Sequence, residues 1–93
     1  MASNPTQITL EESLDIADAC AFQGELKLAL GKGNDIAIAS DELTKIDTTI
    51  LQLLVALVRE TQAAGNKVVW HSPSQALLKT ANLAGLEKEL GVA

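Results

Sequence analysis

One stretch of the sequence decides both the fold and the search for a site: residues 43–54, Leu-Thr-Lys-Ile-Asp-Thr-Thr-Ile-Leu-Gln-Leu-Leu. A polar segment ends there in one acid and two hydroxyls, and a very apolar helix begins. The start of a helix presents unpaired backbone N–H groups and the positive end of the helix dipole. That position suits a capping oxygen, and it also suits a phosphate group. Which of these two uses applies is the main question about function.

Several side chains of this junction are candidates for the helix cap. Thr49 and Gln52 have the spacing of a capping box, and Asp47 or Thr48 is an alternative cap. A cap stabilises a helix by about 1 kcal/mol and needs only one such oxygen. Composition and spacing alone favour this structural interpretation over a functional one.

The helix that follows is expected over residues 48–64 and is strongly amphipathic. Gln52 and Arg59 mark its solvated side. Leu51 and Val55 fall at the margin, where they are either the edge of the core or part of a partner-binding patch, since such patches are often apolar with a polar border. The stripe expected to face the sheet consists of Ile50, Leu53, Leu54, Leu57 and Val58.

Strands and helices alternate along the chain. Short apolar runs bounded by turn residues predict strands near 8–10, 35–39 and 67–71. Helical spacing and stop signals predict helices near 16–30, 48–64 and 73–83, with a further turn at 87–90. Gly31 is expected to end the first helix in the left-handed conformation, and Ser72 with Gln75 to cap the third. This alternation predicts an α/β domain with parallel strands joined by right-handed crossovers.

The length of 93 residues suits one domain with a single core. Residues 1–6 are expected to form a flexible tail and residues 7–93 the domain. Cys20, the single cysteine, is expected to be a buried thiol. The core is expected to include Phe22, Leu26, Ile36, Ile38, Ile50, Leu54, Leu57 and Val68.

Composition argues against several classes of partner. A formal charge of −5 disfavours nucleic acid and anionic lipid, and two aromatic residues are too few for base stacking. The N-terminus lacks the pattern of a signal peptide, and residues 53–58, the longest apolar run, are too short to span a bilayer. We therefore expect a cytoplasmic protein with no membrane insertion.

The sequence also lacks the pattern of an enzyme site. His71 is the single histidine, so no His/Cys metal cluster is expected, and it is interpreted as a polar strand end. Gly31-Lys32-Gly33 is too short for a phosphate-cradling loop of the Walker type. No nucleophile, base and oxyanion site come together. A binding module without cofactor or metal is therefore favoured over an enzyme.

Residues 8–92 resemble a STAS domain, the fold of bacterial anti-sigma-factor antagonists. The resemblance is strongest at residues 46–54, at the Gly-Asn-Lys-Val turn of residues 65–68, and at Leu14-Asp15. Members of the family typically carry Asp-Ser-Ser/Thr-Gly-Leu at the central junction, and the hydroxyl residue after the aspartate is phosphorylated. The resemblance implies that Thr48 is this residue and that Asp15 is the family's acid before the first helix. It also implies one small STAS-like α/β domain with a mixed β-sheet and packed helices.

Three features depart from the family pattern: threonine replaces serine at position 48, Ile50 replaces the usual glycine, and the first hairpin is shortened. The isoleucine fills space that a kinase or partner backbone would otherwise approach. The implied function is that of a non-catalytic bacterial regulator with Thr48 as candidate phospho-switch. Its partner would be an anti-sigma factor, a serine kinase, another signalling kinase or a sensor. The expected contact residues are Asp15, Asp47, Thr48, Thr49, Leu51, Gln52 and Val55.

The short form of the chain also resembles the small STAS subunit of a bacterial phospholipid-transport ABC system. In that subunit a threonine after the aspartate contacts the ATPase. The alternative implied by this resemblance is a structural subunit whose partner is an ABC ATPase.

Overall fold

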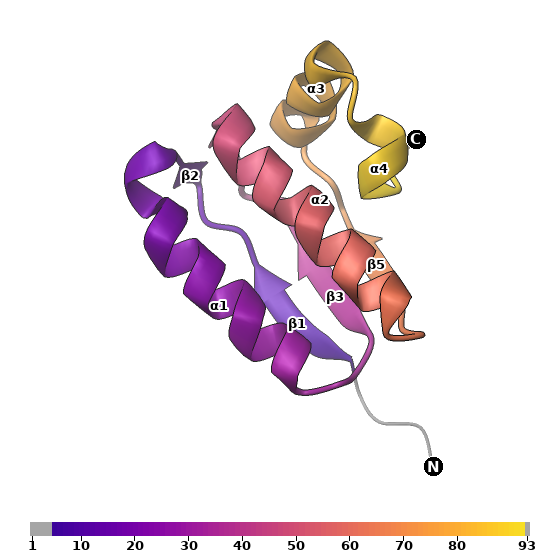
Figure 1. Cartoon of the computed structure of the whole chain (residues 1–93). Helices are drawn as coiled ribbons and strands as arrows, with labels where there is room; N and C mark the ends of the chain where they lie inside the picture. The colour runs from indigo at the N-terminus through magenta and orange to yellow at the C-terminus, as the bar shows by residue number, and fades with distance from the viewer. Residues whose placement is uncertain (1–4, 93) are drawn as a thin grey trace.

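The computed structural model describes residues 5–92 (Figure 1). The strands are β1 (Thr6–Thr9), β2 (Ser13–Leu14), β3 (Ile36–Ala39), β4 (Lys45–Ile46) and β5 (Val68–His71). The helices are a 3-10 turn, η1 (Ile16–Asp18), and the α-helices α1 (Ala19–Gly31), α2 (Thr48–Ala63), α3 (Gln75–Ala84) and α4 (Glu87–Leu90). The predicted alternation of strands and helices is confirmed, including the last helical turn.

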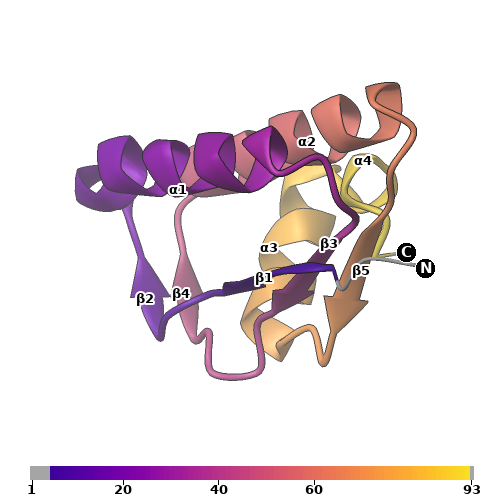
Figure 2. The same ribbon diagram turned by 90° about the horizontal axis from the view of Figure 1, so that it is seen from below.

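The strands form two small parallel sheets. The larger has the order β1-β3-β5, and β2 pairs with β4 in the smaller. Figure 2 shows α1 and α2 over one face of the three-stranded sheet. The predicted α/β class is confirmed, but the sheets are parallel rather than mixed. The reason is that a helix lies between the two strands of every pair, as parallel connections require.

The core lies between the larger sheet and these helices. The register places Ile8, Ile38 and Trp70 side by side on the face under the helices. Seven of the eight expected core residues are buried, with Ile38 and Leu54 fully so. The exception, Val68, is half-buried and packs at the margin of the core, because its strand is at one edge of the sheet.

Two helix ends differ from the expectation. Gly31 is the last residue of α1, and Gly33, with φ 70°, takes the left-handed conformation instead. The cap of α3 is Ser74, whose hydroxyl accepts a hydrogen bond from the Leu77 N–H at 3.1 Å. Ser72 cannot serve as that cap, because its φ of 50° is far from the extended backbone that capping requires.

Cys20 is exposed, so the expectation of a buried thiol is wrong. The buried face of α1 carries Phe22, Leu26 and Ala29. Cys20 lies two positions before Phe22, and two residues correspond to more than half a turn of helix. Its side chain therefore points away from the core.

The first strand begins earlier than the expected residue 8. Thr6 is already the first residue of β1, and its N–H donates to the Asp35 carbonyl at 2.7 Å. Residues 1–4 of the expected tail lie outside the described residues, and the division into tail and domain otherwise stays a prediction. Within residues 5–92, none of the helices has the length and apolar character that crossing a bilayer needs.

Candidate functional site

The short pairing of β2 with β4 brings the two candidate acids together. Leu14 lies beside Ile46 in this parallel pair, and the Asp47 N–H donates to the Leu14 carbonyl at 2.9 Å. Asp15 directly follows Leu14, and Asp47 directly follows Ile46. They therefore lie side by side where two parallel strands end, as the family resemblance implies.

Each of these acids starts a helical segment. Asp15 Oδ1 accepts a hydrogen bond from the Ala17 N–H at 2.9 Å, and the Asp15 N–H donates to Asp18 Oδ2 at 3.0 Å. This reciprocal pair is a capping box, and it fixes the entry into η1 and then α1. Asp47 Oδ1 accepts from the Thr49 N–H at 3.0 Å and caps α2. The two carboxylates thus both have a structural role.

Among the candidate side chains, Asp47 provides the oxygen that caps α2. Thr48 is the first residue of the helix and is exposed, while Thr49 is half-buried. No hydrogen bond from the Thr48 hydroxyl is found within residues 5–92. The Thr49 and Gln52 capping box does not form either, because Asp47 already satisfies the Thr49 N–H. The Thr48 hydroxyl is therefore accessible and has no capping role.

A shallow hollow of about 240 Å³ lies between β2 and β4 and reaches Asp47, the residue before Thr48. Asp15, Asp47 and Lys45 line it. Two carboxylates and one ammonium group leave the hollow with a net negative charge. Its positive components are Lys45 and the N-terminus of the 16-residue helix α2.

The two apolar residues at the margin of α2 belong to the core, the first of the two alternatives that the sequence left open. Leu51 is 0% exposed and Val55 is 7% exposed. The buried stripe of α2 is wide because the helix contacts α1 on one side and α3 and α4 on the other, as well as the sheet. A helical wheel drawn for one covered face places both residues too near the surface.

The exposed line of α2 consists instead of Thr48, Gln52, Ala56 and Arg59. These positions recur at helical spacing. Shallow hollows lie on both sides of Ala56. One, mainly apolar, is lined by half-buried Leu53 and Leu30 at the contact with α1, and the other by Gln52, Arg59 and Leu86. This continuous surface was missed because Leu53 was assigned to the buried stripe.

Two further residues have no place in this site. His71 is the exposed last residue of β5, as expected for a polar strand end. Cys20 lies on the exposed side of α1. Among the described residues, no group of three His, Cys, Asp or Glu side chains is arranged to hold a metal ion.

Comparisons with known proteins agree with the observed fold. The family model described as "Mlab, STAS domain" matches residues 1–92. The solved structure of the anti-sigma factor antagonist SpoIIAA in its unphosphorylated form is similar in fold. It has a TM-score of 0.74 and 21% sequence identity, and the match covers 95% of this chain and 79% of that one. No curated protein matches the sequence. Because the family model spans almost the whole length, this chain belongs to the STAS domain family.

Proposed function

We propose that this chain is a non-catalytic, cytoplasmic bacterial regulator that binds an anti-sigma factor, a signalling kinase or a sensor, and that phosphorylation of Thr48 controls this binding. The observation that carries the proposal is the hydrogen bond from the Thr49 N–H to Asp47 Oδ1. Since Asp47 caps the helix, an exposed hydroxyl remains at the helix start with no structural use. The similar fold of an anti-sigma factor antagonist, solved in its unphosphorylated form, supports this proposal.

A phosphate on Thr48 would change the surface more than the fold. It adds about −1.5 to −2 charges at pH 7. The N-terminus of α2 favours such a charge, so the helix remains formed. Asp47 precedes Thr48 in the chain and Asp15 lies beside Asp47, so the surface becomes strongly negative. A partner docked there is then expelled by like-charge repulsion and by the cost of burying the phosphate.

The partner is expected to contact the exposed line of α2 rather than Leu51 and Val55. Gln52 and Ala56 are exposed next to Thr48 along the helix, and half-buried Leu53 supplies apolar surface at the contact with α1. An apolar centre with a polar border is usual for such interfaces. Leu51 is fully buried and supports this surface from below.

The direct test is phosphorylation by the kinases whose genes neighbour the gene of this protein. The whole chain is incubated with each kinase and ATP, and mass spectrometry locates the phosphate. Phosphate on Thr48, with loss of a complex seen before ATP is added, is the expected result. Thr48→Val should abolish the modification, and the matched variant Thr49→Val should keep it. Phosphate on another residue, or neither phosphate nor complex with any of these kinases, would contradict the proposal.

A second candidate function is that of the STAS subunit of a phospholipid-transport ABC complex, in contact with its ATPase. Threonine rather than serine at position 48 favours this alternative, and the description of the matching family model includes the name Mlab. Affinity purification from membranes should then recover an ATPase and a permease, and Thr48→Asp should release the ATPase. Recovery of soluble signalling proteins only would exclude this alternative.

A further inference from the structure

Among residues 5–92, no strand pairs with the outer edge of β1. The sheet order leaves β3 as the one neighbour of β1 within the described residues. The N–H groups of Thr6 and Leu10 donate to carbonyl oxygens on the β3 side, at 2.7 and 2.8 Å. Alternate residues of a strand point their backbone groups to opposite sides, so those of Gln7 and Thr9 point outward. Such an edge is a template for another extended segment.

A groove runs along this edge between β1 and α1. It consists of two hollows of about 110 and 320 Å³, which share Thr9 and Glu25. The opposite wall consists of α1 and the two residues that flank it, and its side chains recur at helical spacing, so they lie on one face. They are Asp18, Phe22, Glu25, Leu28 and Lys32.

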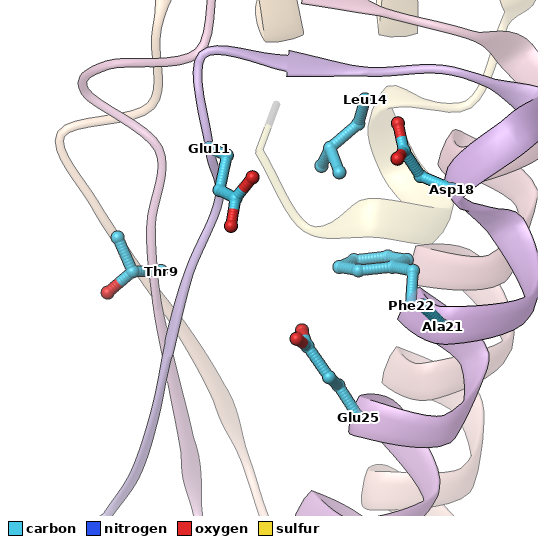
Figure 3. Close-up of a pocket in the computed structure, with 7 residues that line it drawn as sticks. All are labelled: Thr9, Glu11, Leu14, Asp18, Ala21, Phe22 and Glu25. Atoms are coloured by element: carbon cyan, nitrogen blue, oxygen red, sulfur yellow. The ribbon is translucent and has the colours of Figure 1, made fainter.

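The groove has an apolar part and an acidic end. The Phe22 ring is 4% exposed, and Leu28, farther along α1, is 73% exposed. Figure 3 shows the carboxylates of Glu11 and Glu25 pointing into the space beside the Phe22 ring. Asp18 lines the same end. An apolar side chain flanked by a cationic one would find complementary groups here.

We propose that an extended basic segment of a partner protein binds in this groove and adds to the sheet as a fourth strand beside β1. Its backbone would pair with Gln7 and Thr9, and its cationic side chains would lie near Glu11 and Glu25. Recognition of this type takes affinity from main-chain hydrogen bonds and specificity from alternate side chains.

A basic partner fits this edge better than a second copy of the chain. The chain carries a formal charge of −5, and pairing two β1 edges would bring two acidic grooves together. Like charges across an interface oppose association. This surface is formed by β1 and α1, whereas Thr48 is on α2. The proposal therefore does not rest on phosphorylation of Thr48.

The probe is a short synthetic peptide, blocked at both ends, in which lysine and valine alternate. It is titrated into the whole ¹⁵N-labelled chain, and amide shifts and amide hydrogen exchange are followed by NMR. We expect slower exchange at Gln7 and Thr9 on binding. Exchange at Ile8, which is expected to bond to β3 already, should change little and serves as the internal control.

Two peptide controls and two protein variants make the test specific. A peptide with glutamate in place of lysine, and a lysine peptide methylated on alternate backbone nitrogens, should both fail to bind. Glu25→Lys should weaken binding of the lysine peptide about tenfold, since it replaces an attraction by a repulsion. Glu89→Lys, an equal change at an exposed position of α4, should leave binding unchanged.

Three results would overturn the proposal. The first is the absence of binding by the lysine peptide. The second is equal binding by the methylated peptide, which would show that backbone pairing is not involved. The third is concentration-dependent protection of Gln7 and Thr9 in the protein alone, which would identify a second copy of the chain as the occupant.

Discussion

The Thr49 N–H donates to Asp47 Oδ1 at 3.0 Å, and this hydrogen bond identifies Asp47 as the residue that starts α2. The neighbouring Thr48 is left exposed on the first turn. The sequence alone does not show which of these side chains caps the helix, since each of them can do so. The hydrogen bond assigns the capping role to Asp47 and not to Thr48. The carboxylate fixes the helix, and the hydroxyl beside it is accessible for modification or contact.

The first prediction compares these two neighbours in stability. Asp47→Ala should lower the free energy of unfolding by about 1 kcal/mol, because it removes the cap. Thr48→Ala should change it by less than about 0.5 kcal/mol, as is usual for surface positions without such a role. Urea unfolding of both variants measures the difference. A larger loss of unfolding free energy for the Thr48 variant than for the Asp47 variant would show that Asp47 is not the cap.

The second prediction concerns charge at Thr48 in partner binding. Thr48→Asp should keep the melting temperature near that of the wild type, since an acid suits the start of a helix. It should weaken binding to the partner that the kinase screen identifies, because its charge partly mimics phosphate. Thr48→Asn, similar in shape but uncharged, is the matched control and should bind. Thr48→Ala should also bind while losing regulation by the kinase. Equal affinity of the wild type and the three variants for the partner would show that Thr48 has no regulatory role in this interaction.

The third prediction tests the centre of the core. Leu54 is 0% exposed, and Leu54→Ala should lower the free energy of unfolding by about 2–5 kcal/mol, because the lost side chain leaves a cavity. Leu53→Ala, at the half-buried neighbour, should cost less. Chemical denaturation measures the unfolding free energy of both variants. The dependence of this free energy on denaturant concentration should stay unchanged. A change at Leu54 within about 0.5 kcal/mol would contradict the orientation of α2.

The fourth prediction separates support of the site from contact at the site. Leu51→Ala should lower stability, because Leu51 is 0% exposed. Gln52→Ala should leave stability unchanged and weaken partner binding, because Gln52 is exposed on the line that begins at Thr48. Melting temperature and affinity are measured for both. If Leu51→Ala lowered the affinity for the partner without lowering the melting temperature, Leu51 would belong to the partner-binding surface after all.

The fifth prediction concerns the attachment of α4. The Trp70 indole N–H donates to the Leu90 carbonyl at 2.8 Å and links β5 to the end of the chain. Trp70→Phe removes this bond and should cost about 0.5–1.5 kcal/mol plus a small loss of packing. Amide exchange in residues 87–92 should become faster, while β3 stays protected. Unchanged exchange there would show that α4 is held by side-chain packing and not by this hydrogen bond.

Much of the fold follows from local signals in the sequence. The apolar run before Ser40 and the Gly65-Asn66 stop predicted β3 and the end of α2 to within about two residues. These elements were predictable because their signals, a short buried run and a glycine after a periodic helix, depend on neighbours along the chain. The candidate site near Asp47 and Thr48 was predicted from the same junction.

Other features were decided by contacts between distant segments. The two-residue strands β2 and β4 are too short to have a sequence pattern, yet their pairing is what places Asp15 beside Asp47. Leu51 and Val55 are buried because α1, α3 and α4 also cover α2. The choice of Asp47 as the cap likewise depended on its extended backbone, with φ −83° and ψ 148°.

The sequence by itself thus determined the order of the longer strands and helices, most of the apolar stripe of α2 and the acid and hydroxyls at its start. The tertiary structure decided which of these side chains are buried, which one caps the helix and which one is exposed. The physical reason is that periodicity and turn chemistry act within a few residues of the chain, whereas burial depends on every element packed around a side chain. Thr48, a candidate for regulation from the family resemblance, was left without a capping role once Asp47 proved to cap the helix.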